Sequence, residues 1–413
     1  MATQTLNVFL GEDLVGELAQ NASGTTRFQY APPWLDSPAA LPLSASLPLR
    51  PDPFSRNETR PFFAGVLPEE ESRRLIAKVF GVSDKNDFAL LARLGAECAG
   101  AVSLLPQGEF PATARPSYQE ISVAELAERL GLLPRRPLLA GEKGIRLSLA
   151  GAQRKLAVKI SDGAFFLPLE GSPSSHILKP QNPHFPGLVE NEYFCMKLAA
   201  EAGLRVANVE IGTAGGIQFL QVERYDRRLL PDGRLDRIHQ EDFCQAMGVP
   251  PEMKYQQEGG PNLQKCFELV RSVATIPGPD LLQLFDAVVF NILIGNCDAH
   301  GKNFSLLRER SAVRIAPLYD LVSTQAYPEL AIEMAMKLGG ERNPDRLAAK
   351  NWRFFFDHAG ISHAVAQKRL HATAARVLAA LDKLAGAECR GANVVSPIVQ
   401  RHHGIMKSLR WAG

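Results

Sequence analysis

The sequence predicts an α+β protein of two unlike lobes, a small antiparallel β lobe and a larger helical lobe, with an additional N-terminal α/β subdomain. Three observations support this prediction. Short apolar strand patterns separated by turn residues fill residues 145–223, whereas long patterns with helical spacing dominate residues 224–413. A stretch rich in Pro, Gly and Arg, GLLPRRPLLAGEKG at 131–144, precedes the change and indicates a connection between domains.

The bulk composition is that of an ordinary globular protein. The chain has 413 residues, enough for two or three domains, with 46% apolar and 22% charged residues. Asp286 and Asn291 interrupt the longest apolar stretch, so no membrane segment is expected. The N-terminus lacks a secretory pattern, which favours the cytoplasm. A net charge of +2 does not demand a nucleic-acid partner, and six cysteines without a CxxC pair indicate reduced thiols.

The first part of the chain is assigned to the N-terminal subdomain, residues 1–115, and to a connecting segment, residues 116–144. Prolines crowd residues 31–68, so we expect loops and short extended pieces there rather than long helices. Helical spacing follows over residues 69–80 and 86–94.

The small lobe, residues 145–223, carries the strand patterns. LAVKI and AFFLPL flank Ser161-Asp162-Gly163, and Asp-Gly is a strong hairpin signal. SHILK follows as a third strand, and VANVEIG and IQFLQVERY form two more around an Ala-Gly-Gly turn. Residues 188–204 have helical spacing and end at Gly203. This part is therefore predicted to be an antiparallel sheet with one helix.

The large lobe, residues 224–413, is predicted to be mostly helical. Asp280 is expected to cap a helix with the sequence LLQLFDAVVFNILI, which ends at Gly295. Residues 345–358 and 364–386 are further predicted helices. After Glu388 no acidic residue follows, whereas several basic ones do, and this end is interpreted as a solvated tail.

The segment NCDAHGKNF at 296–304 concentrates polar groups directly behind the apolar helix. Asp298 and Asn303 are five positions apart, the separation of the catalytic Asp and the metal-binding Asn in protein kinases. Such an aspartate orients an attacking hydroxyl, while the amide oxygen holds Mg²⁺ on the phosphates. Lys302 would offset phosphoryl charge. Because this spacing often arises by chance, a polar loop at the end of a helix stays an alternative.

A second carboxylate strengthens the metal interpretation. Asp320, in RIAPLYDLVST, follows an apolar strand-like run seventeen residues after Asn303, where a kinase-like lobe brings its other Mg²⁺ ligand. The alternative is a turn or helix-capping residue. Two oxygen ligands in the right order predict binding of a magnesium nucleotide.

The small lobe should supply the phosphate contacts. Lys179 ends an apolar strand, where a lysine is costly without an anionic partner, and Glu192 on the next helix is a candidate ion-pair partner. A lysine reaching solvent is the alternative. LSLAGAQRKLAV at 147–158 contains Gly151, whose small neighbours allow backbone N–H groups to approach phosphates, and Arg154 and Lys155 add positive charge.

Several ordered blocks together resemble the HipA family, the kinase toxins of bacterial toxin-antitoxin pairs. The blocks are AGAQRK, HILKP, NEYFCMKLA, VERYDR, QEDFCQAMGVPPEMKYQQEGG, IGNCDAHGKNFSL and APLYDLVS, and LPLSASLPL and FFAGVLPEEESR are similar to the N-terminal domain of that family. The resemblance covers most of the chain. It implies a two-lobed protein-kinase-like fold and an ATP- and Mg²⁺-dependent serine/threonine protein kinase.

The resemblance also implies roles for individual residues. Asp298 matches the catalytic aspartate, Asn303 and Asp320 match the Mg²⁺ ligands, and Ser148 matches a serine that family members phosphorylate on themselves. A phosphate there would expel the ATP-binding loop. The implied nucleotide-binding residues are Ala150, Gly151, Ala152, Gln153, Arg154, Lys155, Lys179, Glu223, Arg224, Tyr225, His300, Gly301, Lys302, Asn303, Tyr319 and Asp320.

Two positions need separate comment. Arg154 stands where the family is associated with an acidic residue, so this loop is more basic than the resemblance leads us to expect. Cys297, beside Asp298, has no partner pattern for a nucleophile and is interpreted as a core residue.

The resemblance implies partners as well. These are a HipB-like helix-turn-helix antitoxin, operator DNA through the complex with that antitoxin, and a protein substrate of the aminoacyl-tRNA synthetase class, with the glutamyl enzyme as the known example. Growth arrest would follow from phosphorylation of the substrate, and the toxin and antitoxin together would repress their own operon.

Two alternative functions stay open. Asp298, His300 and Asn303 also spell D-x-H-x-x-N, as in phosphoinositide kinases, so the acceptor is a lipid or a small molecule in the first alternative. In the second, the chain is a catalytically silent corepressor that binds the antitoxin-DNA complex. The presence of Asp298, Asn303, Asp320 and Lys179 argues against this second alternative.

Overall fold

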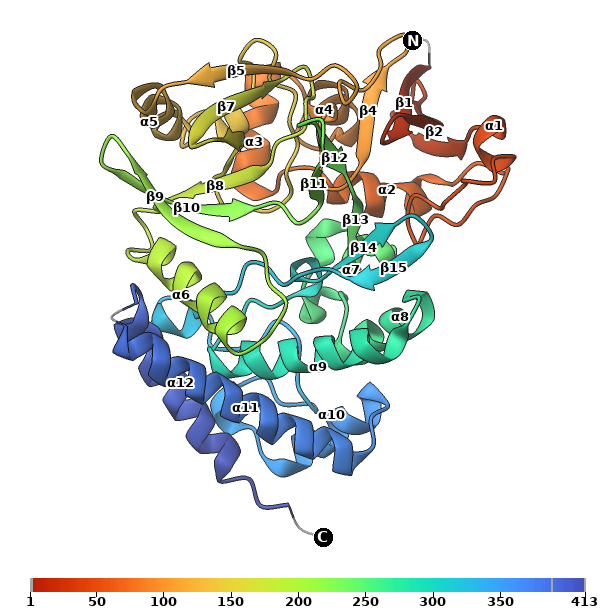
Figure 1. Cartoon of the computed structure of the whole chain (residues 1–413). Coiled ribbons are helices and arrows are strands. Elements are labelled where there is room, and N and C mark those ends of the chain that lie inside the picture. Colours follow the sequence, from red (N-terminus) through yellow and green to blue (C-terminus); the bar gives the residue numbers. More distant parts are fainter. Residues whose placement is uncertain (1–2, 388, 412–413) are drawn as a thin grey trace. The chain divides into compact units, whose positions relative to one another are not determined.

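The computed structural model describes residues 3–387 and 389–411, and the chain divides into two compact units (Figure 1). Unit 1 comprises Met1–Pro180, Gly212–Glu252 and Leu307–Ser311. Unit 2 comprises Gln181–Ile211, Met253–Leu306 and Ala312–Gly413. Among the described residues, no helix combines the length and the apolar character that crossing a membrane requires.

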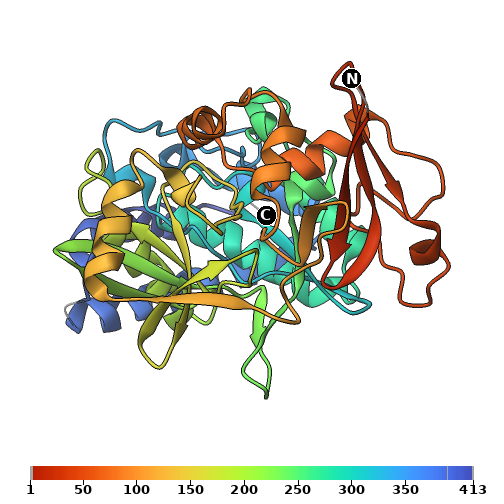
Figure 2. The same ribbon diagram turned by 90° about the horizontal axis from the view of Figure 1, so that it is seen from above.

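Unit 1 begins with a four-stranded antiparallel sheet, drawn in red and orange in Figure 2. Its strands lie in the order β3-β2-β1-β4, with the bounds β1 (Gln4–Leu10), β2 (Asp13–Gln20), β3 (Thr26–Tyr30) and β4 (Val102–Pro106). At Gly16 a Cβ atom would lie 2.3 Å from the carbonyl oxygen of Gln29, so glycine permits the close approach of β2 and β3. The sequence analysis assigned no strands to residues 1–30.

Four helices accompany this sheet: α1 (Pro32–Leu35), α2 (Arg56–Gly65), α3 (Glu70–Phe80) and α4 (Asp87–Leu94). The last two confirm the predicted helical segments. The expectation of loops throughout the proline-rich stretch is wrong for α2, which contains Pro61. A capping box between Ser55 and Glu58 starts this helix, and the buried Phe62 and Phe63 anchor it, which outweighs the one backbone hydrogen bond that a proline removes.

The larger sheet of unit 1 has the strand order β5-β7-β6-β8-β10-β9, with β9 in this unit only from Gly212 onward. The predicted strands correspond to β6 (Leu156–Ser161), β7 (Ala164–Leu169), β8 (His176–Pro180), β9 (Val209–Ala214) and β10 (Ile217–Glu223). Asp162 and Gly163 have φ values of 50° and 79°, so the β6–β7 hairpin has the predicted tight turn.

The segment expected to connect two domains contributes structure of its own. It forms β5 (Ser117–Ile121), which pairs with β7 at the edge of the larger sheet, and α5 (Val123–Leu132). A capping box between Ser122 and Glu125 starts α5. Unit 1 also contains β11 (Arg227–Leu229), β12 (Leu235–Arg237), β13 (His239–Asp242) and α7 (Phe243–Ala246).

Unit 2 is built around α9 (Pro277–Leu293), which contacts α8, α11, α12 and β15 (Figure 1). The other helices are α6 (Leu188–Glu201), α8 (Leu263–Val273), α10 (Ala349–Ala359), α11 (His363–Gly386) and α12 (Ala392–Lys407). The strands β14 (Ser305–Glu309) and β15 (Ala312–Ile315) follow the segment predicted to be catalytic. The helices predicted over residues 188–204, 345–358 and 364–386 are thus present.

Two details of the predicted helical lobe are wrong. Asp280 does not cap α9, because the helix begins at Pro277 and places this buried aspartate in its first turn. The segment after Glu388 is not a solvated tail. It forms α12, whose buried Val395, Val399 and Met406 lie on a helix that contacts α6, α9 and α11. The excess of basic residues concealed the apolar stripe of this helix.

Candidate active site

The loop after α9 carries the predicted catalytic residues and is tightly held. Gly295 has a φ of 66°, and a Cβ atom there would lie 2.8 Å from the side-chain oxygen of Gln325, so the turn requires glycine. Successive peptide groups are then hydrogen-bonded. The Asn296 N–H donates to the Asn291 carbonyl at 2.8 Å, and the Cys297 carbonyl accepts from the Ala335 N–H at 2.7 Å. Few alternative backbone positions remain for the residues that follow.

Asp298 is bound through its backbone and through its side chain. Its N–H donates to Oδ1 of Asn296 at 3.1 Å, and its Oδ1 accepts a hydrogen bond of 2.8 Å from the Tyr255 hydroxyl. The ring of Tyr255 packs edge-on against His300, with 5.2 Å between the centroids. The sequence analysis included Tyr255 only inside a family block and gave it no role, because no spacing rule connects residues 43 positions apart.

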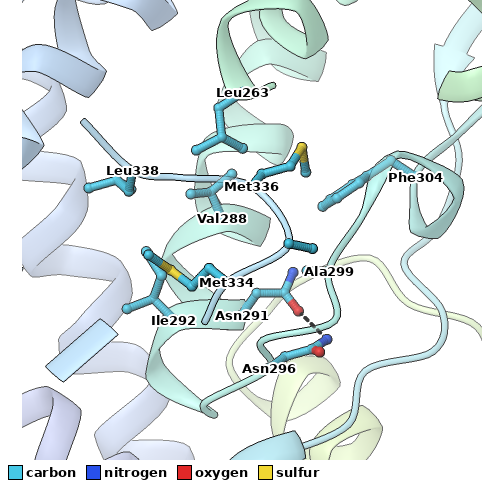
Figure 3. A pocket seen from close by; sticks show the side chains of 11 residues that line it. Leu263, Val288, Asn291, Ile292, Asn296, Ala299, Phe304, Met334, Met336 and Leu338 are labelled. Carbon is cyan, nitrogen blue, oxygen red and sulfur yellow. Dashed lines mark hydrogen bonds between the residues drawn. The ribbon is translucent and has the colours of Figure 1, made fainter. Parts of the chain in front are cut away.

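A small cavity of about 30 Å³ lies beside this loop (Figure 3). Asn291 and Asn296 border it and are joined by a hydrogen bond of 2.8 Å from Nδ2 of Asn296 to Oδ1 of Asn291. Apolar side chains, including Met334 and Met336, make up most of the remaining lining. A space of this volume admits a few atoms and is too small for a nucleotide. We therefore assign the cavity to the packing beside the loop and not to the nucleotide site.

The segments that carry Asn303 and Asp320 are also joined. The Tyr319 hydroxyl donates to the Lys302 carbonyl at 2.7 Å and lies 2.7 Å from the Ser305 hydroxyl. Asp320 has a φ of 53°, a left-handed conformation that is uncommon for non-glycine residues. Unit 2 therefore brings together the neighbours of both predicted metal ligands.

The donor atoms of this region are suited to a hard cation. Oδ1 of Asn303 is buried and accepts no hydrogen bond from the residues described, and a buried amide oxygen without a partner is a natural ligand position. Within residues 3–387 and 389–411 no cluster of three or more His, Cys, Asp or Glu side chains has metal-binding geometry. One amide and one carboxylate nevertheless fit Mg²⁺, which keeps several ligand positions for water and phosphate oxygens.

The remaining predicted residues of the loop are mostly buried. Gly301 and Asn303 belong to a short 3₁₀ turn, and His300 and Lys302 are each 8% exposed. Cys297 is 5% exposed, and burial raises the pKa of its thiol to about 11, which agrees with the predicted core role. A lysine is rarely buried to this extent, so Lys302 is suited to facing an anion rather than solvent.

In unit 1 the segment around Ser148 is inserted between two other segments. The Ser148 hydroxyl donates to the Val66 carbonyl at 2.8 Å, and its N–H donates to the Glu97 carbonyl at 2.8 Å. Gly151 makes a parallel bridge to Pro68. The side chain of Ser148 is fully buried, so its hydroxyl is reachable only after this segment has moved.

The predicted phosphate loop, Ala150–Lys155, lies directly after that serine. Gly151 has a φ of 99°, and the Lys155 ammonium donates to the Ala150 carbonyl, which closes the loop on itself. Arg154, the basic residue at a position expected to be acidic, lies 3.8 Å from the exposed carboxylate of Glu71. Ala152 is exposed, and Gln153 is partly buried.

Lys179 lies inside the larger sheet. It belongs to β8, opposite Leu220 of β10, and is 6% exposed. A position on a strand of the larger sheet agrees with the phosphate-binding role predicted for Lys179. Glu192, on α6 in unit 2, is 2% exposed. Pairing of these two residues stays a prediction, as does convergence of Lys179 with the residues of unit 2.

Arg224, at the predicted hinge, belongs to a buried charge cluster. We define this cluster as Glu97, Arg224, Asp226, Arg227 and Arg237. Glu97 accepts from Arg224 at 2.9 Å and from Arg227 at 3.0 Å, and Arg224 also binds Asp226 at 2.8 Å. Although burial opposes it, these arginines hold the pKa of Glu97 below its usual value.

These contacts bear on the prediction that Glu223, Arg224 and Tyr225 form the hinge that receives the adenine. The Arg224 N–H donates to the Ser175 carbonyl at 2.9 Å, so the backbone donor and the guanidinium of Arg224 are both engaged within unit 1. Glu223 is the last residue of β10, opposite His176, and the Tyr225 hydroxyl bonds to Gln240. Of the three predicted hinge residues, Arg224 therefore serves the structure of unit 1.

Comparison with known proteins identifies the family. The model of the HipA-like C-terminal domain matches residues 147–383, and that of the HipA N-terminal domain matches residues 6–105. Y4mE of Sinorhizobium fredii, named as a candidate kinase, is 50% identical over 374 residues, which cover 90% of this chain and 89% of Y4mE. The serine/threonine-protein kinase toxin HipA of Shewanella oneidensis is 33% identical over 390 residues, covering 91% of this chain and 88% of that protein.

A solved structure supports the same assignment. A chain in the complex of the toxin-antitoxin system HipA, HipB and operator DNA from Shewanella oneidensis matches with a TM-score of 0.85 and 29% identity. The match covers 98% of this chain and 97% of that chain, which confirms the predicted two-lobed α+β fold. The matches to both domain models and to a relative of nearly equal length agree with the resemblance seen in the sequence. The chain belongs to the HipA family.

Proposed function

We propose that the chain is an ATP- and Mg²⁺-dependent serine/threonine protein kinase that acts as a growth-arresting toxin in the cytoplasm. The observation that carries this proposal is the arrangement in unit 2. There, a tightly held loop presents Asp298 and Asn303, and Tyr319 joins that loop to the segment of Asp320. The name of the Shewanella oneidensis relative supports the reaction class.

The residues of unit 2 would perform the chemical step. Asp298 orients the acceptor hydroxyl and takes up its proton as the oxygen attacks the γ-phosphorus of ATP, the bond to the β–γ bridging oxygen breaks and ADP leaves. Asn303 and Asp320 would hold Mg²⁺, which when bound neutralises charge on the phosphates. Lys302 lies beside Asn303 and adds positive charge for the transferring phosphoryl group.

Unit 1 would bind the nucleotide. Ala150–Lys155 and Lys179 contact the phosphates, and the hinge receives the adenine. Because Arg224 is engaged in the buried charge cluster, we assign the hinge contacts to its neighbours Glu223 and Tyr225. His300, Gly301 and Tyr319 complete the nucleotide site from unit 2.

Transfer of label from radiolabelled ATP tests the reaction. Purified protein with Mg²⁺ should label protein bands of a bacterial lysate beyond those that the lysate labels alone, whereas Asp298→Gln, which removes the charge and lengthens the side chain by one methylene, should add none. Extracted lipids and small-molecule fractions form parallel arms. Label confined to those fractions would contradict the protein-kinase assignment, and label nowhere would favour the silent corepressor.

The proposal includes a HipB-like helix-turn-helix antitoxin and operator DNA bound through it. The solved complex of the relative contains both. Expression of the chain alone should arrest growth, and coexpression of the antitoxin should restore it. Asp298→Gln should abolish arrest and still bind the antitoxin. Growth arrest that survives this substitution would show that toxicity does not depend on phosphoryl transfer.

The proposed protein substrate is of the aminoacyl-tRNA synthetase class, with the glutamyl enzyme as the first candidate. Purified synthetases incubated with the chain, Mg²⁺ and labelled ATP test this assignment individually. Phosphorylation of one synthetase and loss of its charging activity would support the class. Equal labelling of unrelated proteins would contradict it.

Autophosphorylation of Ser148 is the proposed means of silencing the kinase. In its buried position the serine has no room for a charged phosphate, so the modified segment would leave its place between Val66 and Glu97. Intact-mass measurement with Mg-ATP should show one added phosphate in the wild type and none in Ser148→Ala. A phosphate that persists in Ser148→Ala would assign the modification elsewhere.

A further inference from the structure

Two adjacent residues in unit 2 connect elements that the sequence analysis treated separately. Ser323 and Thr324, which we call the 323–324 joint, follow Asp320 closely in the chain. Both are largely buried, with exposures of 0% and 8%. The sequence analysis gave neither residue a role, because nothing in their spacing distinguishes them from an ordinary turn.

Ser323 is fastened to α6 by a single side chain. Oδ1 of Asn191 accepts the Ser323 N–H at 2.9 Å, and Nδ2 of Asn191 donates to the Ser323 carbonyl at 3.0 Å. The amide therefore satisfies both peptide groups of one residue, as a neighbouring strand would. Asn191 is 1% exposed, so no water replaces these bonds, and losing them would leave buried groups unpaired.

Thr324 is fastened to the catalytic loop. Its hydroxyl oxygen accepts the Cys297 N–H at 2.8 Å, and the hydroxyl donates to the Gly295 carbonyl at 3.1 Å. The Gln325 N–H adds a second bond to that carbonyl at 3.1 Å. Cys297 directly precedes Asp298, so the joint acts on the peptide next to the proposed catalytic residue.

The joint thus holds three chain segments in a fixed relation within unit 2. One segment is α6, where Asn191 adjoins Glu192, the second is the loop of Asp298, and the third is the joint's own segment, which begins at Asp320. Each attachment uses neutral donors and acceptors, namely the Asn191 amide, the Thr324 hydroxyl and peptide groups. A shift of the joint would therefore displace Asp298 relative to Asp320.

We propose that Asn191 and Thr324 are positioning residues for phosphoryl transfer, acting through the 323–324 joint to set the separation of Asp298 and Asp320. This inference rests on the proposed kinase function. Neither residue touches the substrate in this role. Their effect is on the turnover number, kcat, rather than on the KM for ATP, because the proposed nucleotide contacts lie on other residues.

The chain offers matched substitutions for a test. Thr324→Val keeps the shape and removes the hydroxyl, whereas Thr324→Ser keeps the hydroxyl. Asn191→Leu removes the amide from α6. Asn351→Leu is its control, because Asn351 is also buried and also binds two peptide groups, the Ala348 N–H at 3.0 Å and the Gly339 carbonyl at 2.9 Å.

The expected results follow from the loss of rate that a displacement of Asp298 relative to Asp320 would cause. Thr324→Val and Asn191→Leu should each lower kcat by up to about 100-fold with the KM for ATP changed less than about threefold. Thr324→Ser should restore most of the rate. Asn351→Leu should lower the melting temperature comparably to Asn191→Leu while kcat stays near that of the wild type.

The double variant Asn191→Leu/Thr324→Val tests whether the two residues act through the same joint. If both residues act through one joint, the combined loss of kcat should be clearly smaller than the product of the two single losses. Independent, multiplicative losses would overturn the proposal, and so would an equal loss of kcat in Asn351→Leu. Because all variants are compared with an active wild type, inactivity of the wild type itself would count against the kinase function instead.

Discussion

Two regions of this molecule fix irregular chain segments by opposite chemistry. In unit 1, the buried charge cluster combines three arginines with two carboxylates, and burial together with neighbouring positive charge lowers the pKa of Arg237 to about 10. In unit 2, the loop of Asp298 is held by amides, hydroxyls and peptide groups. Charged anchors near Asp298 would compete with its substrate, whereas the cluster has no reaction to disturb.

Charged and neutral anchors are suited to different places in a protein. A buried ion pair gains strength from the low local dielectric but costs desolvation, so removing one partner is far more damaging than never having had the pair. A neutral hydrogen bond contributes less and adds no strong field. Loss of a charged anchor in the cluster should therefore appear in stability alone, whereas loss of a neutral anchor of the Asp298 loop should also appear in the rate.

The largest expected effect is that of Glu97→Gln in the buried charge cluster. The substitution leaves three buried arginines with only Asp226, and we expect the free energy of unfolding to fall by about 3–5 kcal/mol. Urea unfolding measures this change. Arg234→Ala is the control, because the ion pair of Arg234 with Asp232 is exposed and its loss should leave the midpoint unchanged. Equal effects of both substitutions would contradict the comparison.

A smaller loss of stability is expected for Asp286→Asn in unit 2. Asp286 on α9 accepts from Arg369 at 2.8 Å and Arg376 at 2.9 Å on α11, and both arginines are partly exposed. Water therefore screens this pair, and the free energy of unfolding should fall by about 1–2 kcal/mol. Thermal unfolding gives the measurement. A fall in the free energy of unfolding as large as that caused by Glu97→Gln would mean that burial does not determine how much these ion pairs contribute.

The pH dependence of stability should depend on Glu241 in unit 1. Burial raises the pKa of this carboxyl to about 7, although Ser44 and the Ala45 N–H donate to it. Between about pH 4.3, its usual pKa, and that value, the folded protein binds more protons than the unfolded chain, so the free energy of unfolding contributed here falls as pH rises.

Glu241→Gln removes this titration. The difference in melting temperature between wild type and variant should therefore change steadily across about pH 5 to pH 7, to the disadvantage of the wild type as pH rises. His239, whose pKa burial lowers to about 4, is present in both proteins, so its contribution largely cancels in the difference. A difference that does not vary with pH would show that Glu241 is already charged at pH 5.

The smallest expected effect is on the rate, in Tyr255→Phe. Loss of the hydroxyl removes one hydrogen bond to Oδ1 of Asp298, worth about 1 kcal/mol, so kcat should fall about fivefold. The free energy of unfolding should fall by no more than about 1 kcal/mol, well below the loss expected for Glu97→Gln. Steady-state kinetics and urea unfolding of the same sample check both. A large loss of stability with an unchanged rate would reverse the roles assigned to the two regions.

The regular elements of the sheet and most helices followed from local sequence patterns. The Asp162-Gly163 turn and the period of β6 and β7 specify their hairpin, and α9 follows from its apolar length. The N-terminal strands were not foreseen, although β1 and β2 have 7 and 8 residues and Gly11, with a φ of 64°, lies in the turn between them. The pairing of β1 with β4, about one hundred residues away, depends on the tertiary structure and not on local sequence.

The candidate site shows a similar division. Asp298, Asn303 and Asp320 are proposed as site residues because their spacing matches that of the catalytic and metal-binding residues of protein kinases. Tyr255, Asn191 and Thr324 were not identifiable from the sequence, because their roles depend on contacts between distant segments of unit 2. Arg224, whose nucleotide-binding role stays a prediction, also makes ion pairs with Glu97 and Asp226 that its local sequence did not indicate.

The enclosure of Ser148 has a kinetic consequence. A hydroxyl that is reached only when its segment detaches reacts no faster than the detachment itself, whatever the reagent or its concentration. Raising the concentration of any modifying agent should thus bring the rate to a plateau equal to the opening rate. The rate of modification at Ser148 then reports how often its own segment opens, and not how often other molecules collide with the protein.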